Sequence, residues 1–437
     1  MEDGAGEAVA DEADAQGCAS HGIHFRNAVS KVQAPGDNGD VNRADEQTGG
    51  VSGMRGAGGT GGVRGLGAGV NLLALRSHNT ALVLDLLRTA GPDGISRLEL
   101  AERTGLTPQA VSKITARLRE DGLAAEAGRR ASTGGKPRTV LRLVPEAGHA
   151  VGVHLDRDEV RVVLVDLRGA VAGERRAPLD LGAGAGAVLA AVTAAVRETA
   201  AGVLSAVPGA EAGALTGSGS LLGVGVALPG PLDHTRGVLH RVTGFPEWDG
   251  FPLREALAER LGVPVVIDKD TNAAAVGLAA GGEGGSFAYL HLGTGLGAGL
   301  VIGGSVHRGA RTGAGEFGHQ VIQLDGPPCT CGNRGCVEAL CLAAVARGDT
   351  EEAARVLGAG AANLVGLLDI DIVLLGGRTV GAAPEPFVRG VGAVLEARAR
   401  RTGQDAVPVR VAAGGARVVA AGAAELVLGP VFGRGDG

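Results

Sequence analysis

Three of the five cysteines in this chain stand within eight residues of one another, in a pattern that suits a metal ion. They are Cys329, Cys331 and Cys336, and His319 lies ten residues before the first of them. Three thiolates and one imidazole satisfy tetrahedral zinc, and the glycines between the cysteines let the chain turn sharply around the ion. With four protein ligands and no open position, the predicted zinc is structural. The alternative is a loop of reduced cysteines with an incidental histidine and no metal.

The composition indicates a globular protein of the cytoplasm. Of its 437 residues 45% are hydrophobic, and the formal net charge of -6 excludes a protein that coats nucleic acid or anionic membrane with its whole surface. The N-terminal segment is acidic where a signal peptide would be basic and then apolar, and no apolar run reaches the length that crosses a bilayer. We therefore expect a cytoplasmic protein with no membrane partner, in which clustered cysteines are metal ligands or redox groups and not disulfides.

Residues 1–72 predict a disordered, low-complexity tail. They are rich in Gly, Ala and Asp and carry no sustained apolar period. Such a segment cannot bury enough surface to offset the entropy that is lost when a chain becomes ordered. We interpret it as an extension without a function of its own.

Residues 73–146 predict a winged helix-turn-helix domain, which binds DNA. A helix is expected from Asn79, because apolar residues recur at helical spacing until a Gly-Pro pair. A second helix follows Ser96, and the glutamate three residues after this serine is typical of a capping box. A turn at residues 105–107 leads to a third helix that Thr107 caps and that begins at Pro108. Two strands with a polar, glycine-rich tip then complete the wing.

Positive charge gathers in this region although the whole chain is acidic. Residues 76–144 hold 12 Lys plus Arg and 7 Asp plus Glu, a net of 12 - 7 = +5. Contact with phosphates requires such a local basic surface, although a charge run can also be a solvated face. The third helix of these domains reads bases in the major groove, a role expected here of Gln109, Ser112 and Lys113, and the wing contacts phosphates. The expected DNA-binding residues are Thr107, Gln109, Ser112, Lys113, Arg117, Arg129, Arg130, Lys136 and Arg138.

From residue 147 to the end, apolar runs alternate with helical patterns. Each run closes on glycines or an acidic residue, as in VPVVIDKD and DIVLLGG. Buried strands that end in ligand-binding loops have this form in α/β folds, where the cleft lies at the strand ends. We therefore expect an α/β domain with a ligand cleft.

The metal-ligand pattern continues backward and forward into a longer motif. It reads Glu316-x-Gly318-His319-x9-Cys329-x-Cys331-Gly-x2-Gly-Cys336-x-Glu338. This motif resembles the signature of the ROK family of repressors, open reading frames and kinases. The segments LPGPLD from Leu228, IDKDTNAAA from Ile267, GTGLGAG from Gly293 and LLGG from Leu374 are similar to cleft segments of that family. The resemblance implies a two-lobed, actin-like sugar-kinase fold (ribonuclease H-like, ASKHA) over residues 147–437, behind the winged helix-turn-helix domain.

The resemblance also implies which residues bind a sugar. In the family, the glutamate and histidine of the Glu-x-Gly-His segment and the glutamate after the last cysteine hydrogen-bond sugar hydroxyls. These positions are Glu316, His319 and Glu338 here. Asp270 occupies a further sugar-binding position, where the aspartate of kinases takes the proton from the attacking hydroxyl.

The first phosphate loop departs from the family's Asp-x-Gly-Gly-Thr pattern. His154 stands in place of the aspartate, Asp156 and Arg157 in place of the glycines, and Asp158 in place of the threonine. The two carboxylates would repel the polyphosphate of a nucleotide, and Arg157 does not easily offset that repulsion. We therefore expect that ATP phosphoryl transfer is lost and that Asp270 is only an ancestral base position.

Lys269 is a second departure, because the family has an asparagine before the aspartate. We expect Lys269 to pair with one of the flanking acids, Asp268 or Asp270. The alternative is that its cation favours a phosphorylated or acidic sugar.

The sequence thus predicts a sugar-responsive transcriptional regulator, a repressor, and not an enzyme. Its expected partners are operator DNA and a sugar or sugar-phosphate effector, and the family implies a homodimer or homotetramer. The competing hypothesis is an ATP-dependent sugar kinase with an attached DNA-binding domain. A third is a regulator that has lost sugar binding and responds to a protein partner.

Overall fold

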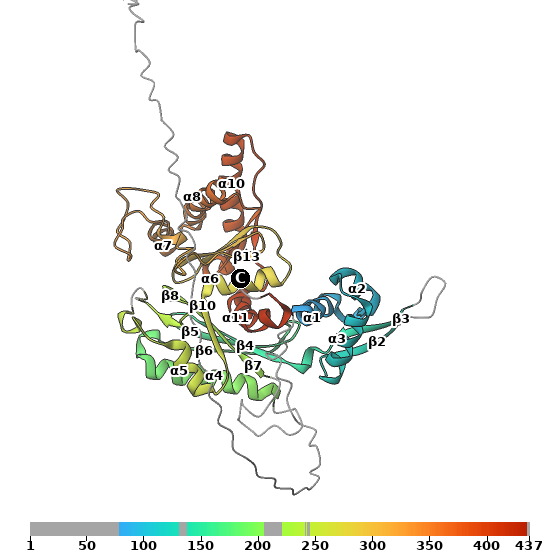
Figure 1. Ribbon diagram of the computed structural model, residues 1–437. Helices are drawn as coiled ribbons and strands as arrows, with labels where there is room; N and C mark the ends of the chain where they lie inside the picture. Colours follow the sequence, from blue (N-terminus) through green and yellow to red (C-terminus); the bar gives the residue numbers. More distant parts are fainter. Residues whose placement is uncertain (1–77, 131–137, 205–220, 241, 243–244, 435–437) are drawn as a thin grey trace, which may run out of the picture. The chain divides into compact units, whose positions relative to one another are not determined.

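Figure 1 shows the computed structural model, which describes residues 78–130, 138–204, 221–240, 242 and 245–434. The expected tail and the tip of the wing, with Lys136, lie outside the described residues. The described residues form a small domain of helices and strands, followed by two α/β lobes that each contain a five-stranded sheet.

The first domain has the predicted helix-turn-helix and wing. Its sheet has the strand order β1-β3-β2, and Leu84, Leu100 and Leu118 from the three helices are buried in one core. The elements are α1 (His78–Ala90), β1 (Ile95–Ser96), α2 (Arg97–Thr104), α3 (Pro108–Glu120), β2 (Ala124–Arg130) and β3 (Arg138–Leu143).

The helix ends of this domain follow the expected capping chemistry. The Ser96 hydroxyl accepts from the backbone N–H of Glu99 at 3.3 Å, and the Glu99 carboxylate accepts from the Ser96 N–H at 2.8 Å, which confirms the capping box. Gly105 ends α2 in the left-handed conformation, with φ 69°. Thr107 then caps α3 by accepting from the N–H of Ala110.

The first lobe is a mixed sheet in the order β10-β7-β4-β5-β6. Alternate valines of β4 and β7 pack against α4 and α5 on one face of this sheet. The elements are β4 (His149–Leu155), β5 (Glu159–Asp166), β6 (Val171–Pro178), α4 (Ala185–Leu204), β7 (Leu221–Leu228), β8 (Leu232–Asp233), β9 (Val238–Leu239), α5 (Leu253–Leu261) and β10 (Val265–Lys269).

The second lobe repeats this arrangement in the order β13-β12-β11-β14-β15. In both lobes the first three strands in the chain are antiparallel neighbours and the last two are added in parallel. Helices α7, α8 and α10 pack on one face of the second sheet. The elements are β11 (Phe287–Leu292), β12 (Leu296–Ile302), β13 (Ser305–Val306), α7 (Val337–Ala346), α8 (Thr350–Leu368), β14 (Ile372–Gly376), α9 (Arg378–Ala382), α10 (Pro384–Thr402) and β15 (Val409–Val411).

Two helices, α6 (Asp270–Ala280) and α11 (Val418–Leu428), lie against each other between the two sheets (Figure 1). Glycines permit the close approach. A Cβ atom on Gly225 of β7 would lie 1.8 Å from the carbonyl oxygen of Ala423, and one on Gly277 of α6 would lie 2.7 Å from the Cα atom of Gly422. The backbone of α11 therefore touches the first sheet and α6 without intervening side chains.

The stretch Gly415–Phe432, which contains α11, is long and apolar enough to cross a membrane by length and composition, contrary to the expectation from the sequence. Within the structure 67% of it is buried. It packs against α6, β4, β7 and β5, and these contacts account for its apolar character.

Candidate functional site

The parallel strands of both lobes end at one cleft, as the sequence predicts. The segments after β4, β7, β10 and β11 all contribute to its wall. Asp270, Glu316, His319 and Glu338, the four residues expected to bind a sugar, line this same cleft. The structure thus brings together groups that are up to 68 positions apart in the chain (338 - 270 = 68).

Each of these acidic side chains is held differently. Asp270 is the first residue of α6 and directly follows β10. Burial raises the pKa of Asp270, although His291 and the backbone N–H of Thr271 act in the opposite direction. Glu338 lies in the first turn of α7 and accepts from the N–H of Leu296 at 2.8 Å, which fixes it to the start of β12.

Lys269 also lines the cleft, but its partner is not the one expected. Its ammonium group donates to the carboxylate of Glu316 at 2.7 Å and to the carbonyl oxygen of Ala314 at 2.9 Å. Asp268 instead accepts from Arg308 at 2.7 Å, and both of these side chains are buried. The expected pairing of Lys269 with Asp268 or Asp270 is therefore wrong, because the side chain extends away from its neighbours in the chain toward the segment after β13.

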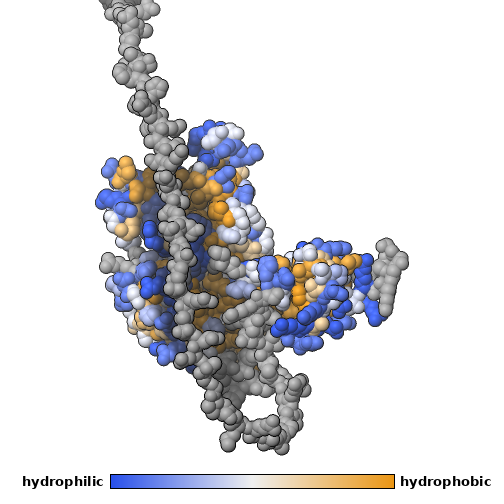
Figure 2. Space-filling view, viewed as in Figure 1, coloured by the Kyte–Doolittle hydropathy of each residue, from blue (hydrophilic) through white to orange (hydrophobic). Residues whose placement is uncertain are grey.

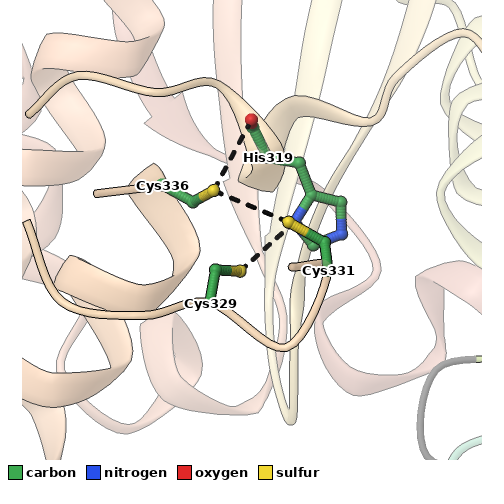
Figure 3. Close-up of side chains that lie close together, drawn as sticks. All are labelled: His319, Cys329, Cys331 and Cys336. Carbon is green, nitrogen blue, oxygen red and sulfur yellow. Dashed lines mark hydrogen bonds between the residues drawn. The ribbon is translucent and has the colours of Figure 1, made fainter. Parts of the chain in front are cut away.

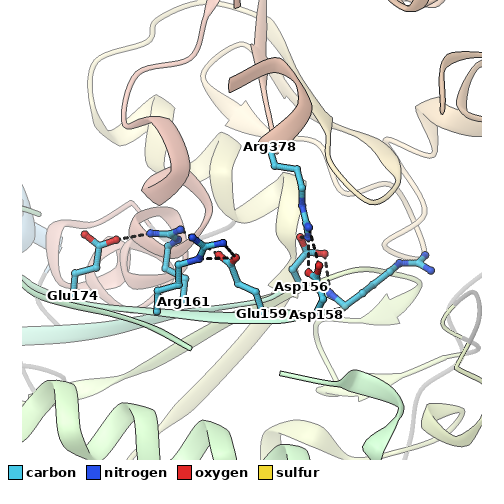
Figure 4. A network of polar contacts seen from close by, with 8 residues as sticks. Asp156, Asp158, Glu159, Arg161, Glu174 and Arg378 are labelled. Atoms are coloured by element: carbon cyan, nitrogen blue, oxygen red, sulfur yellow. Dashed lines mark hydrogen bonds and ion pairs between the residues drawn. The ribbon is translucent and has the colours of Figure 1, made fainter. Parts of the chain in front are cut away.

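The degenerate phosphate loop contains an ion-pair network (Figure 4). Arg378, the first residue of α9, donates to Asp156 at 2.5 Å and to both carboxylate oxygens of Asp158 at 2.6 and 2.8 Å. The hydroxyl of Thr294 donates to Asp156 at 3.0 Å. The sequence predicts only Arg157 as a partner, and the one signal for Arg378 is its place directly after the LLGG segment.

These contacts set the charge of the loop. Burial tends to raise the pKa of Asp156, but hydrogen bonds from Arg378 and from the Arg157 N–H outweigh it and hold that pKa below its ordinary value. The hydrogen bonds from Arg378 also lower the pKa of Asp158. Burial, with the nearby His291, lowers the pKa of His154 to about 3, so that this imidazole is neutral at physiological pH. A neutral ring cannot take the role of the aspartate that the family has at this position.

The predicted metal ligands form a compact cluster (Figure 3). One ligand atom from each of His319, Cys329, Cys331 and Cys336 lies within 4.8 Å of all the others. The Cys331 and Cys336 sulfur atoms are 3.7 Å apart, and the Cys329 sulfur is 3.7 Å from Nδ1 of His319. Tetrahedral coordination with metal–sulfur bonds of about 2.3 Å places ligand atoms about 3.8 Å apart, so the four residues could hold a metal ion.

The local chain explains why the four ligands converge. His319 ends the short helix η6 (Phe317–His319), and Cys336 is the N-cap of α7. Gly335 has φ 66°, and a Cβ atom there would lie 1.6 Å from the carbonyl oxygen of Gln323. Burial raises the pKa of the Cys336 thiol to about 12, whereas a hydrogen bond from the backbone of Asn333 lowers the pKa of Cys331. Cys341 lies in α7, outside the cluster, as expected.

The residues predicted to bind DNA lie on exposed faces of the winged-helix domain. In the helix-turn-helix, Thr107, Gln109, Ser112, Lys113 and Arg117 are all exposed, whereas Val111 and Leu118 are buried. Arg129 and Arg138 are exposed on the wing strands; Arg130 is in β2, but its side chain is outside the described residues, as is Lys136. Hydrophilic residues gather at the lower edge of the domain in Figure 2, where Figure 1 places α3.

A buried ion pair joins this domain to α11. Arg88 of α1 donates to both carboxylate oxygens of Glu425 of α11, at 3.1 and 2.5 Å, and lies over the ring of Phe432 at 4.6 Å. The Arg88 and Glu425 side chains are only 9% and 8% exposed. No local sequence signal predicts this contact, because its partners are 337 positions apart.

Comparisons with known proteins agree with this architecture. Residues 191–347 match the ROK family model, and residues 91–124 match a model described as winged helix-turn-helix DNA-binding. The chain is 28% identical over 328 residues to the putative xylose repressor of Caldicellulosiruptor sp. (strain Rt8B.4). The aligned residues cover 65% of this chain and 79% of the relative. It is 32% identical over 277 residues to the DNA-binding transcriptional dual regulator NagC of Escherichia coli (strain K12). That alignment covers 62% of this chain and 64% of the relative.

A solved structure extends the likeness to both parts of the chain. It is described as a ROK family transcriptional regulator, homolog of the E. coli MLC protein. It is 19% identical, has a TM-score of 0.63, and covers 82% of this chain and 97% of its own. At that identity the likeness supports the fold alone. This chain therefore contains a ROK family domain, matched at residues 191–347, which a winged helix-turn-helix domain precedes.

Proposed function

We propose that this protein is a DNA-binding transcriptional regulator, a repressor, whose ROK domain binds a sugar or sugar derivative and thereby changes its affinity for operator DNA. One observation carries the proposal. The cleft keeps all four residues expected to contact sugar hydroxyls, while the first phosphate loop holds Asp156 and Asp158 in an ion pair with Arg378. A cleft of this kind is suited to binding a sugar and unsuited to binding a nucleotide.

The names of the relatives support the same function. They are a putative xylose repressor and a DNA-binding transcriptional dual regulator, and we infer operator DNA and a sugar as the partners of this chain. The exposed α3 face, with Gln109, Ser112 and Lys113 at its N-terminal part, would read bases in the major groove. Arg129, Arg138 and Lys136 of the wing would contact phosphates. Two-fold operators would require a homodimer or homotetramer, and the site of action would be the cytoplasm.

We infer that the metal ion of the Cys/His cluster is zinc in a structural role. A set of three sulfur ligands and one nitrogen suits zinc, and four protein ligands leave no position for a reactive water. The cluster lies between Glu316 and Glu338 in the chain, next to the cleft that both line. Zinc would hold these two carboxylates in place, and the cluster would contribute no chemistry of its own.

The packing supports a route from the cleft to the DNA-binding domain. Helix α6 begins at Asp270 in the cleft and packs closely on α11 through Gly277 and Gly422. Helix α11 carries Glu425, which pairs with Arg88 of α1. A ligand that binds one arrangement of the lobes better than another would shift α11 and therefore α1, and with it the spacing of the paired recognition helices.

The test begins with the DNA. Genome-wide mapping of bound DNA would give the operator, and the neighbouring genes would suggest the sugar. Fluorescence anisotropy of that operator with the full chain should then show a change in affinity when the correct sugar is added. Absence of any sequence-specific DNA binding would overturn the regulator proposal.

The sugar-kinase alternative has one feature in its favour, because Asp270 lines the cleft at the position of the ancestral base. A coupled assay for ADP formation over hexoses, pentoses and amino sugars distinguishes the two functions. We expect no turnover. Turnover that is lost in Asp270→Asn would establish the kinase.

A further inference from the structure

Lys269 is an unusual residue in this chain. The sequence has four lysines among its 41 basic residues, and Lys269 is the single lysine after Lys136. It lies in the cleft with only 4% of its surface exposed. Its aliphatic carbons run along Gly230, where a Cβ atom would approach them to 3.3 Å. The side chain is therefore held in one direction, with its ammonium group at the far end.

The ammonium group and the carboxylate of Glu316 form a pair of opposite hydrogen-bonding character. An ammonium has three N–H donors, and those of Lys269 reach Glu316 and the carbonyl oxygen of Ala314. The Glu316 side chain remains 47% exposed at the cleft. A sugar hydroxyl both donates and accepts, so it can donate to the carboxylate and accept from the ammonium at the same time. A phosphate or carboxylate group only accepts, and it would meet the Glu316 charge.

The net charge of the cleft also favours an uncharged ligand over an anionic one. The described residues that line it include four acids, Asp156, Asp270, Glu316 and Glu338, and two bases, Arg157 and Lys269, a sum of 2 - 4 = -2. If Asp270 holds a proton, the sum is -1 and is still negative. Lys269 is the one buried cation among these lining residues, and it is already paired with a carboxylate at 2.7 Å. An anionic ligand would therefore enter a site of its own sign.

We infer that Lys269 is a specificity-determining residue, which together with Glu316 selects an uncharged sugar through one of its hydroxyl groups and rejects sugar acids and sugar phosphates. This inference rests on the proposed sugar-sensing function and names the chemical class of the effector. It reverses the alternative that the lysine favours a phosphorylated or acidic sugar.

The first experiment measures ligand preference by isothermal titration calorimetry on the full chain. The uncharged probes are D-xylose, D-glucose and N-acetyl-D-glucosamine. The charged counterparts are D-xylonate, D-glucuronate, D-glucose 6-phosphate and N-acetyl-D-glucosamine 6-phosphate. We expect at least one uncharged sugar to bind at least tenfold more tightly than its charged counterparts. A charged counterpart that binds as tightly as, or more tightly than, every uncharged probe would overturn the inference.

Two variants then test the pair itself. Lys269→Met removes the donor and should weaken binding of the uncharged sugar at least tenfold. Glu316→Gln leaves the ammonium without its carboxylate and should move the preference at least tenfold toward the charged counterpart. Because Lys269 is buried and its variant could lose its fold, the Glu316 variant, at a half-exposed side chain, provides the second reading. Unchanged preference in Glu316→Gln would also overturn the inference.

A matched control separates the local effect from a change of net charge. Arg401→Ala removes an exposed cation at the end of α10, outside the cleft, and should leave both affinities unchanged. Melting temperature and metal content confirm that each variant is folded. If sugars bind and change operator affinity but charged forms are preferred, only this inference fails. If no probe of either class binds, the proposed sugar-sensing function fails with it.

Discussion

Arg378 of the second lobe donates hydrogen bonds to both carboxylate oxygens of Asp158 of the first lobe, at 2.8 and 2.6 Å. The same guanidinium reaches Asp156, which also accepts from Thr294. This network occupies the loop where the family resemblance places nucleotide phosphates. Through Arg378, the two carboxylates therefore connect the two lobes.

Arg378→Ala should remove a pH-dependent part of the stability. The folded-state pKa values of Asp156 and Asp158 are lowered, so their contribution is present above the unfolded value of about 3.9 and is lost as pH falls through the folded values. Because the Arg378 side chain is 44% exposed, we expect a loss of about 1 kcal/mol or less at pH 7. Chemical denaturation from pH 6 to pH 3 should show the difference between the wild type and the variant shrinking below pH 4. A difference that grows toward acid would contradict the assigned pair.

Arg88→Met should lower the free energy of unfolding more than Arg378→Ala does, because it leaves the Glu425 carboxylate buried without its partner. Loss of one member of a buried ion pair costs about 3–5 kcal/mol. We expect a decrease of that order in the free energy of unfolding, measured by chemical denaturation. The double variant Arg88→Met, Glu425→Leu replaces the pair by apolar groups and should recover most of the loss. If the double variant is as unstable as the single one, the pair is not the cause.

The metal site makes a prediction about composition and stability together. Purified protein should contain one zinc ion per chain, and Cys331→Ser should lose it and unfold at a lower temperature, because metal binding contributes to folding. Elemental analysis and thermal denaturation measure the two effects. The control is Cys341→Ala, which removes a buried thiol outside the cluster and should keep the metal. Retention of zinc by Cys331→Ser would exclude this cysteine as a ligand.

The roles proposed for the DNA-binding residues differ between helix and wing. Lys113→Ala should reduce discrimination at one base position by about 1–3 kcal/mol. Arg138→Ala and Lys136→Ala should weaken binding to all sequences and lower the salt slope by about 1 each. Anisotropy titrations with operator and with unrelated DNA at several salt concentrations separate these effects. Equal losses on both kinds of DNA from the helix and wing variants would contradict the assignment.

Much of the fold could be predicted because its signals are local. The Ser96–Glu99 capping box, the turn at Gly105 and the cap at Thr107 each depend on residues within a few positions, and the structure confirms all three. The metal cluster also spans only 18 residues, from His319 to Cys336, and two glycines close its loop. Short segments of this kind carry their own geometric constraints.

The partners of the charged residues could not be predicted in this way. Lys269 pairs with Glu316 rather than with its flanking acids, and Arg378 pairs with residues that precede it by more than 200 positions. Such pairs depend on which strand ends the tertiary fold brings together. Lys269 is adjacent in sequence to both aspartates. Its partner is nevertheless decided by the direction in which its side chain extends from the end of β10.

The glycine contacts of α11 restrict how the cleft can open. Gly152 and Gly225 of the first sheet face the carbonyl oxygens of Ala420 and Ala423, and Gly277 of α6 faces Gly422. Because backbone lies directly against backbone at these glycines, a sliding displacement would bring main-chain atoms into collision. The lobes would instead rotate relative to each other about α11. Such a rotation would be transmitted to Arg88, because its partner Glu425 lies on α11.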